Sequence, residues 1–111
     1  MGGRGVMNIF DVYIAYVSWG SDGKRRPVLI LEETVENVTA LNITSKYESK
    51  SEAIRAGYFV INDWKTAGLN RQSYIDTNKA VNFPITAIDK NPLGRLSAED
   101  EIRLIKFINQ Q

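Results

Sequence analysis

Residues 10–17 read Phe-Asp-Val-Tyr-Ile-Ala-Tyr-Val, and residues 26–31 read Arg-Pro-Val-Leu-Ile-Leu. β-Branched and aromatic residues dominate the first run, which is typical of a strand in a pleated sheet. The second run is apolar on both faces from Pro27 to Leu31, as in a central strand, where a proline at the first residue removes no ladder hydrogen bond. Trp19 to Arg25 lies between the two runs, and its two glycines and polar residues predict an exposed, mobile hairpin loop.

The rest of the chain predicts further short strands and one clear helix. Leu41 and Ile43 alternate with Asn42 and Thr44, as in a strand with one more apolar face. The expected strands are Val38–Ser45, Tyr58–Ile61, Ser73–Phe83 with a bend near Asn78, and Gly94–Leu96. The segment Lys46–Ala56 is polar with a weak helical tendency, and Asn62–Gly68 has the residues that start and end a short helical turn.

The C-terminal segment has the pattern of an amphipathic helix. Ser97 can cap it, acidic residues fill its first turn with Asp100 three residues after the cap, and basic residues come late. Ile102, Ile105 and Ile108, together with Leu104, predict one apolar stripe that docks against the sheet. The expected fold class is therefore α+β and mainly β, a small twisted antiparallel sheet or barrel with a C-terminal helix.

Composition limits the chain to one ordinary globular domain. Its 111 residues are 43% hydrophobic and 24% charged, with a formal net charge of +1 and neither Cys nor His. We predict a single domain over residues 8–111, after a disordered leader or tag remnant at residues 1–7. Disulfides and the usual zinc sites are excluded, no apolar run could span a membrane, and we expect a cytoplasmic protein.

The densest basic feature is Lys24-Arg25-Arg26, at the entry to the second predicted strand. Spacing alone favours a solvated hairpin end, while the functional alternative is a phosphate site, because guanidinium groups match phosphate oxygens. Arg26 is the better candidate, since a strand start holds a side chain more rigidly than a loop tip. Antiparallel pairing of consecutive strands would place Thr44 beside Arg26, and a slip of one residue would substitute Ser45.

Other chemistry is weakly represented. Trp19 could cover the core or offer a stacking platform for a base, and the two readings are equally supported. The acidic residues Asp22, Glu48 and Asp76 have no metal-ligand spacing, so the sequence predicts no metal site and disfavours a two-metal nuclease. No glycine-rich loop precedes a helix, so nucleotide hydrolysis is not indicated.

Several motifs in fixed order carry a family resemblance. Asp11-Val-Tyr-Ile-Ala, Arg26-Pro-Val-Leu-Ile, Asn42-Ile-Thr-Ser and Ser73-Tyr-Ile-Asp-Thr-Asn-Lys79, followed by Gly94-Arg-Leu-Ser97, resemble the MazF/PemK toxins of type II toxin-antitoxin modules. The resemblance covers about Phe10 to Phe107. It implies the small barrel shared with the gyrase toxin CcdB, which is like a Src-homology-3 barrel, and it implies a homodimer and an antitoxin partner.

The same resemblance implies a metal-independent endoribonuclease with no cofactor. Arg26 falls on the family's catalytic arginine and Thr44 on its catalytic threonine, and attack by the substrate's own 2′-hydroxyl would cleave single-stranded RNA. The residues expected to bind substrate are Trp19, Lys24, Arg25, Ser45, Lys46, Asn78 and Lys79. Two features depart from the family pattern: the loop at residues 18–25 is short and lacks a Glu-Gln pair, and the fifth strand has Asp76 and Asn78 where relatives often have a basic residue and then Asp.

Two other functions compete with this hypothesis. One is a non-catalytic binder with the toxin fold, either a CcdB-like gyrase inhibitor or an inactive relative. The other is a small barrel that binds single-stranded nucleic acid broadly, which the net charge of +1 disfavours.

Overall fold

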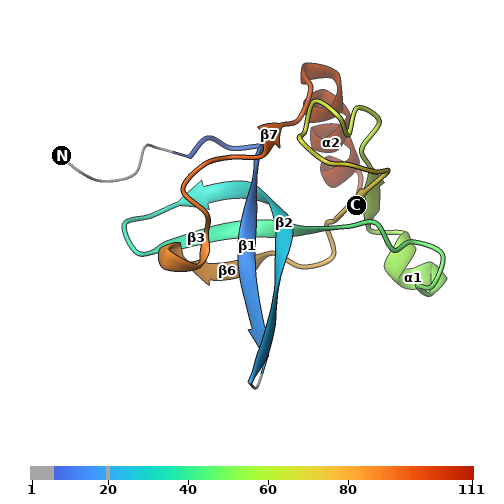
Figure 1. Cartoon of the computed structure of the whole chain (residues 1–111). Helices are drawn as coiled ribbons and strands as arrows, with labels where there is room; N and C mark the ends of the chain where they lie inside the picture. Colours follow the sequence, from blue (N-terminus) through green and yellow to red (C-terminus); the bar gives the residue numbers. More distant parts are fainter. Residues whose placement is uncertain (1–6, 20) are drawn as a thin grey trace.

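A computed structural model describes residues 7–19 and 21–111, with the side chain of Trp19 also outside the description. The described chain forms a curled antiparallel sheet with a helix at its C-terminal end (Figure 1). The sheet has seven strands in the order β4-β5-β3-β2-β1-β7, and β6 pairs with β3 off this path. The strands are β1 Asp11–Trp19, β2 Asp22–Glu33, β3 Asn37–Thr44, β4 Tyr58–Val60, β5 Tyr74–Asp76, β6 Val81–Pro84 and β7 Gly94–Arg95. The helices are α1 Glu52–Arg55, the 3₁₀ helix η1 Ile85–Ala87 and α2 Ala98–Asn109. The predicted fold class, mainly β with a C-terminal helix, is confirmed.

The first two strands form a longer hairpin than the sequence predicted. Pairing of β1 with β2 continues out to Trp19 opposite Asp22, with Val17 opposite Lys24. The prediction of a loop over Trp19–Arg25 is therefore wrong, because the basic residues lie within β2. The polarity of this segment predicts a loop, but exposed strand positions carry polar side chains as readily as loops do.

Strand β3 is shared by two successive partners on one edge. Ile43 faces Ile75 of β5, whereas Ala40 faces Val81 of β6. Ala40 and Ile43 are three residues apart on β3, whereas their partners Val81 and Ile75 are six residues apart. The extra residues of the β5–β6 segment, around Asn78, therefore lie outside the ladder. The predicted strand Ser73–Phe83 is in fact two strands, broken where a bend was expected.

The sheet separates two clusters of buried side chains. One lies under α2 and includes Leu29, Leu41 and Ile75. The other lies on the opposite face of β2 and β3 and includes Val28 and Ile30. Consecutive strand residues point to opposite faces, so a continuous apolar run such as 28–30 supplies both clusters.

Helix α2 begins as predicted but buries a different face. Ser97 accepts a hydrogen bond from the Asp100 amide at 3.1 Å, which confirms the cap. Leu104 is fully buried, whereas Ile102, Ile105 and Ile108 are 56%, 46% and 39% exposed, so the predicted isoleucine stripe does not dock against the sheet. With 3.6 residues per turn, residues two apart lie about 200° apart around the helix, so Leu104 and Ile102 face opposite ways. The docked face is instead Asp100, Leu104 and Phe107, at helical spacings of four and three.

The ends of the described chain bear on two further expectations. Met7, which was placed in the predicted leader, is buried in the second cluster, and its amide donates to Glu33 Oε1 at 2.8 Å. Residues 1–6 lie outside the described residues. Among the described helices, none is long and apolar enough to cross a membrane.

Candidate functional site

Arg26 and Thr44 come from neighbouring strands and reach the same end of the sheet. Val28 of β2 faces Asn42 of β3, and the same register continued by two residues sets Arg26 opposite Thr44. Both side chains line one groove, and both also line a second groove beside it. The antiparallel arrangement expected from the sequence thus brings these two residues together, and Ser45 lines the first groove with them.

Arg26 is fixed on a strand, and no described acidic side chain neutralises its guanidinium. It pairs with Ala15 of β1 and lies two residues before the buried Val28, on the same face of the sheet. Its side chain is half-buried, and no acidic side chain among the described residues forms an ion pair with it. By contrast, the neighbouring Arg25 is ion-paired with Asp89. Arg26 is therefore the guanidinium of this pair that is available to an anion.

The Thr44 hydroxyl has a defined orientation. Its oxygen accepts a hydrogen bond from the backbone amide of Lys46 at 3.0 Å. A hydroxyl has one proton to donate, and no described group accepts it from Thr44. The hydroxyl can therefore donate to an oxygen that enters the groove.

The first groove is strongly basic although the whole chain is nearly neutral. It has a volume of about 280 Å³, and no acidic residue is among those that line it. Its lining includes Ser45 and the cationic residues Lys24, Arg25, Arg26, Lys46 and Arg71. Clustered charges of one sign in a concave site focus the electrostatic field, so this groove favours an anionic ligand such as a phosphodiester.

The second groove adds residues that sequence reasoning did not identify. It has a volume of about 340 Å³ and is also lined by Asn42, Lys50, Tyr58 and Asp76. Asp76 faces Tyr58 across the β4–β5 pair, and burial together with the charge of Asp76 raises the pKa of Tyr58. The Oδ1 atom of Asn42 is buried and has no hydrogen-bond partner among the described residues.

Three of the predicted substrate-binding residues are not placed at these grooves. Asn78 lies on the interruption between β5 and β6, and its amide donates to Ile54 O at 3.0 Å and to Asp76 Oδ1 at 2.9 Å. It holds Asp76 and does not line either groove. Lys79 is exposed beside it and also lines neither groove. The side chain of Trp19 lies outside the described part of the chain.

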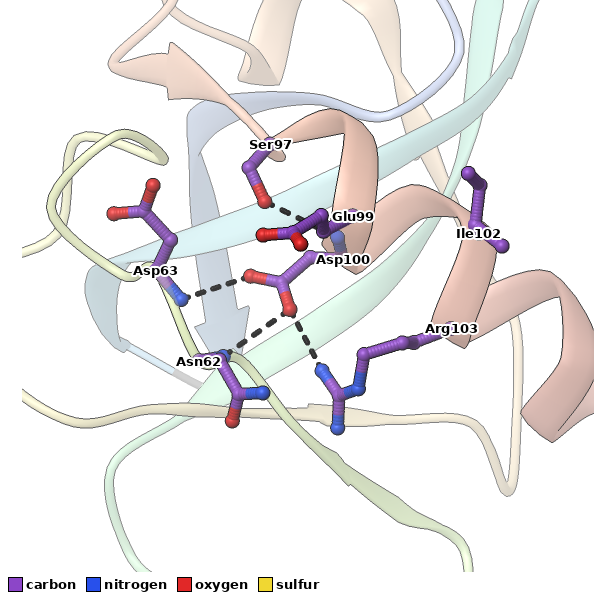
Figure 2. A pocket seen from close by; sticks show the side chains of 7 residues that line it. All are labelled: Asn62, Asp63, Ser97, Glu99, Asp100, Ile102 and Arg103. Atoms are coloured by element: carbon purple, nitrogen blue, oxygen red, sulfur yellow. Dashed lines mark hydrogen bonds and ion pairs between the residues drawn. The ribbon is translucent and has the colours of Figure 1, made fainter.

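A third pocket, at the start of α2, is structural in character. It is lined by Asn62, Asp63 and the first turn of α2, and Figure 2 shows Asp100 at its centre. The buried Asp100 carboxylate accepts from the Asp63 amide at 2.9 Å, from the Asn62 amide at 3.3 Å and from Arg103 at 2.7 Å (Figure 2). These hydrogen bonds join the first turn of α2 to the backbone of residues 62–63, so this carboxylate anchors the helix.

The turn at residues 62–68, whose amides donate to Asp100, matches the short helical turn predicted at Asn62–Gly68. Hydrogen bonds from Thr66 lower the pKa of Asp63, as in the predicted cap of a short turn. Gly68 ends the turn with a φ of 83°, a conformation that favours glycine. Within residues 7–19 and 21–111, no three acidic side chains lie close enough together to hold a metal ion.

Comparison with known proteins gives matches among solved structures. No family model matches the chain, and no curated protein matches it. The chain is similar to Mycobacterium tuberculosis toxin MazF-mt6, with 26% sequence identity, a TM-score of 0.67 and coverage of 90% of this chain and 93% of that chain. It is also similar to a crystal structure of an Mtb toxin, with 24% identity, a TM-score of 0.61 and coverage of 88% and 97%. Both similarities extend over about nine tenths of this chain.

Proposed function

Because the chain has the fold of MazF-like toxins, we propose that it is the toxin of a toxin-antitoxin module and cleaves single-stranded RNA without a metal ion. The observation that carries this proposal is the placement of Arg26 and Thr44 on two paired strands, in a basic groove, with no ion pair to the Arg26 guanidinium from any described residue. As a toxin of this kind, the protein would also bind an antitoxin.

In the proposed reaction the substrate supplies its own nucleophile. The 2′-hydroxyl oxygen attacks the adjacent phosphorus, the bond to the 5′-oxygen of the next nucleotide breaks, and the products are a 2′,3′-cyclic phosphate and a 5′-hydroxyl. Negative charge grows on the non-bridging phosphoryl oxygens as the phosphorus becomes crowded. Arg26 would neutralise this charge, and Thr44 would donate its hydroxyl proton to one of these oxygens.

Two proton transfers accompany this step. The 2′-hydroxyl proton needs an acceptor, and Asp76 is the carboxylate that lines the same groove as Arg26 and Thr44. We assign it the role of base, because carboxylates accept protons while a guanidinium with a pKa above ~12 does so poorly. The leaving 5′-oxygen takes up a proton from solvent or from a cationic group of the groove. DNA lacks the 2′-hydroxyl and would not be cut.

The test is a gel assay of purified protein on a long, unstructured RNA in the presence of a chelator, followed by primer extension across the products. The parent protein should give discrete cuts, and Arg26→Ala should give none while keeping its thermal unfolding midpoint. Lys65→Ala serves as the matched control, because it removes one positive charge from an exposed residue that lines neither groove. It should cut as the parent does.

Each outcome decides between the catalytic and the non-catalytic function. Cuts that persist in a folded Arg26→Ala variant would refute the assigned role of Arg26. No cuts by the folded parent protein would refute the nuclease and leave a toxin-fold binder, with gyrase and the antitoxin as the partners to test.

A further inference from the structure

Three tyrosines gather beside the second groove. The rings of Tyr47 and Tyr74 are stacked, with centroids 4.5 Å apart and planes at 22°. The Tyr58 ring is tilted against both, at 6.2 Å from Tyr47 and 6.5 Å from Tyr74. All three side chains are half-buried, so the cluster has accessible ring surface.

Tyr58 joins the candidate site to another cavity. It lines the groove that contains Arg26, Thr44 and Asp76, and it also lines a cavity of about 360 Å³ on its other side. That cavity contains Tyr47 and Tyr74 together with Lys106 of α2. The two spaces therefore share Tyr58 in their linings, and the groove and the cavity together are called the track below.

The cavity beyond Tyr58 has an apolar base and a cationic rim. Phe59 and Phe107 meet edge to face at 5.6 Å and form its base, while Lys106 and Arg103 border it from α2. Arg103 is ion-paired with Asp100, but Lys106 forms no ion pair among the described residues. Aromatic faces next to a free ammonium suit a ligand that has a planar ring on a phosphodiester backbone.

We propose that Tyr58, with Tyr47 and Tyr74, is a base-stacking subsite for a nucleotide of the single-stranded RNA that flanks the cleaved phosphate. The inference rests on the proposed function, because it takes the groove of Arg26 as the place of cleavage. A base would stack on Tyr58, and Lys106 would contact the phosphate next to it.

Tyr58 is the residue of the three best placed to receive the base. Tyr47 is already engaged by Tyr74 and by the Arg55 guanidinium, which lies 5.3 Å from its ring centroid. Tyr58 has only tilted contacts with its neighbours and borders both spaces. A tyrosine hydroxyl is uncharged near neutral pH, and burial together with Asp76 raises the pKa of Tyr58 further, so the hydroxyl does not repel phosphate.

The experiment measures RNA binding separately from cleavage. The probe is a pool of random RNA decamers with 2′-fluoro riboses, which lack the nucleophile, and with 5-iodouridine in place of uridine. Fluorescence anisotropy gives the affinity, and photo-cross-linking followed by peptide mapping gives the residue in contact with a base. The variants are Tyr58→Leu, which removes the ring, Tyr58→Phe, which keeps it, and Tyr16→Leu as the matched control on an exposed tyrosine outside the track.

Loss of one base–aromatic stack should weaken binding by Tyr58→Leu about tenfold. Tyr58→Phe and Tyr16→Leu should bind like the parent, and cross-links should map to Tyr58, Tyr47 or Tyr74. Parent-like binding by a folded Tyr58→Leu variant, with no cross-link at these tyrosines, would overturn the subsite and favour a protein side chain as the occupant of the cavity.

The cleavage assay keeps the two proposals separate. If the parent protein cuts RNA and Tyr58→Leu behaves as the parent in binding and cross-linking, the subsite is refuted and the nuclease stands. If the parent protein does not cut but the cross-links and the tenfold loss are observed, the stacking subsite stands and the nuclease is refuted.

Discussion

Thr44 differs from an ordinary strand hydroxyl in where its proton can go. Its oxygen is already used as the acceptor of the Lys46 amide, and the groove in front of it is lined by cations. A hydroxyl held in this way needs no reorganisation when charge develops on a nearby oxygen. Such preorganisation is the usual source of electrostatic stabilisation in a transition state.

We expect Thr44→Ala to lower kcat for RNA cleavage by about 10² to 10³-fold, the usual effect of removing one donor from a site of developing negative charge. Thr44→Ser should keep most of the activity, because it keeps the donor. Single-turnover rates measure the effect, and Thr39→Ala is the control, since Thr39 lies on β3 outside both grooves. Equal rates for Thr44→Ala and the parent protein would show that the hydroxyl does not act in the reaction.

The site was predictable from the sequence only where its residues are close in chain order. Arg26 and Thr44 belong to consecutive strands of a meander, so antiparallel pairing alone brings them together. Asp76 and Tyr58 reach the groove through the pairing of β5 with β3 and of β4 with β5. That pairing follows a connection whose length and course carry no local signal, so no pattern in the sequence indicates it.

The Asp100 carboxylate anchors the first turn of helix α2, and the amphipathic pattern of the helix does not predict this role. Asp100 is fully buried, and it connects the 62–63 backbone with Arg103 through three hydrogen bonds. A buried carboxylate is tolerated only when such partners compensate for its lost hydration. Its removal leaves amide donors and a guanidinium without their acceptor.

Replacing this carboxylate should therefore destabilise the fold without touching the grooves. We expect Asp100→Ala to lower the free energy of unfolding by about 3 kcal/mol, as measured by urea denaturation. Glu99→Ala, at the adjacent exposed acid of the same turn, should cost less than about 1 kcal/mol. A similar small loss for both variants would mean that Asp100 does not anchor the helix.

The elements were predicted best where propensity and burial agree. β1, β3 and β4 match their predicted ranges within about three residues, because β-branched and aromatic residues there are also buried. The arm of β2 that contains Lys24 and Arg25 was missed because its residues are polar and exposed. The buried face of α2 was predicted wrongly, because the pattern of three isoleucines indicated an apolar stripe, whereas the structure buries Leu104 and leaves the isoleucines exposed.

At the scale of the whole molecule, the exposed isoleucines of α2 remain without a partner among the described residues. At 3.6 residues per turn, Ile108, Ile105 and Ile102 lie about 40°, 100° and 160° from Leu104 around the helix, so they form a stripe that runs from the edge of the docked face to the opposite side. Exposed large apolar groups on one helix face commonly mark an interface. The family resemblance implies a homodimer, and we propose that this face of α2 contributes to it.

We expect a sedimenting mass of two chains, each of 12.5 kDa, at micromolar concentration. Ile105→Lys should shift the protein towards a single chain, because a charge would replace an apolar contact in the interface. Val35→Lys is the control, since Val35 is 92% exposed in the connection between β2 and β3. A strictly monomeric parent protein would refute the dimer, and a dimeric Ile105→Lys variant would place its interface elsewhere.

The division of the sheet into two faces has a genetic consequence. The side chains under α2 support folding, while the end of the opposite face holds Arg26, Asn42 and Thr44. Mutations in alternate positions of one strand therefore belong to different phenotypic classes. Under the proposed function, changes at Leu41 would lower the amount of protein in the cell, and changes at Thr44 would leave that amount unaltered while relieving growth arrest. If the chain is the proposed toxin, a lineage under selection to escape it can thus inactivate it while still producing a folded chain for the proposed antitoxin to bind.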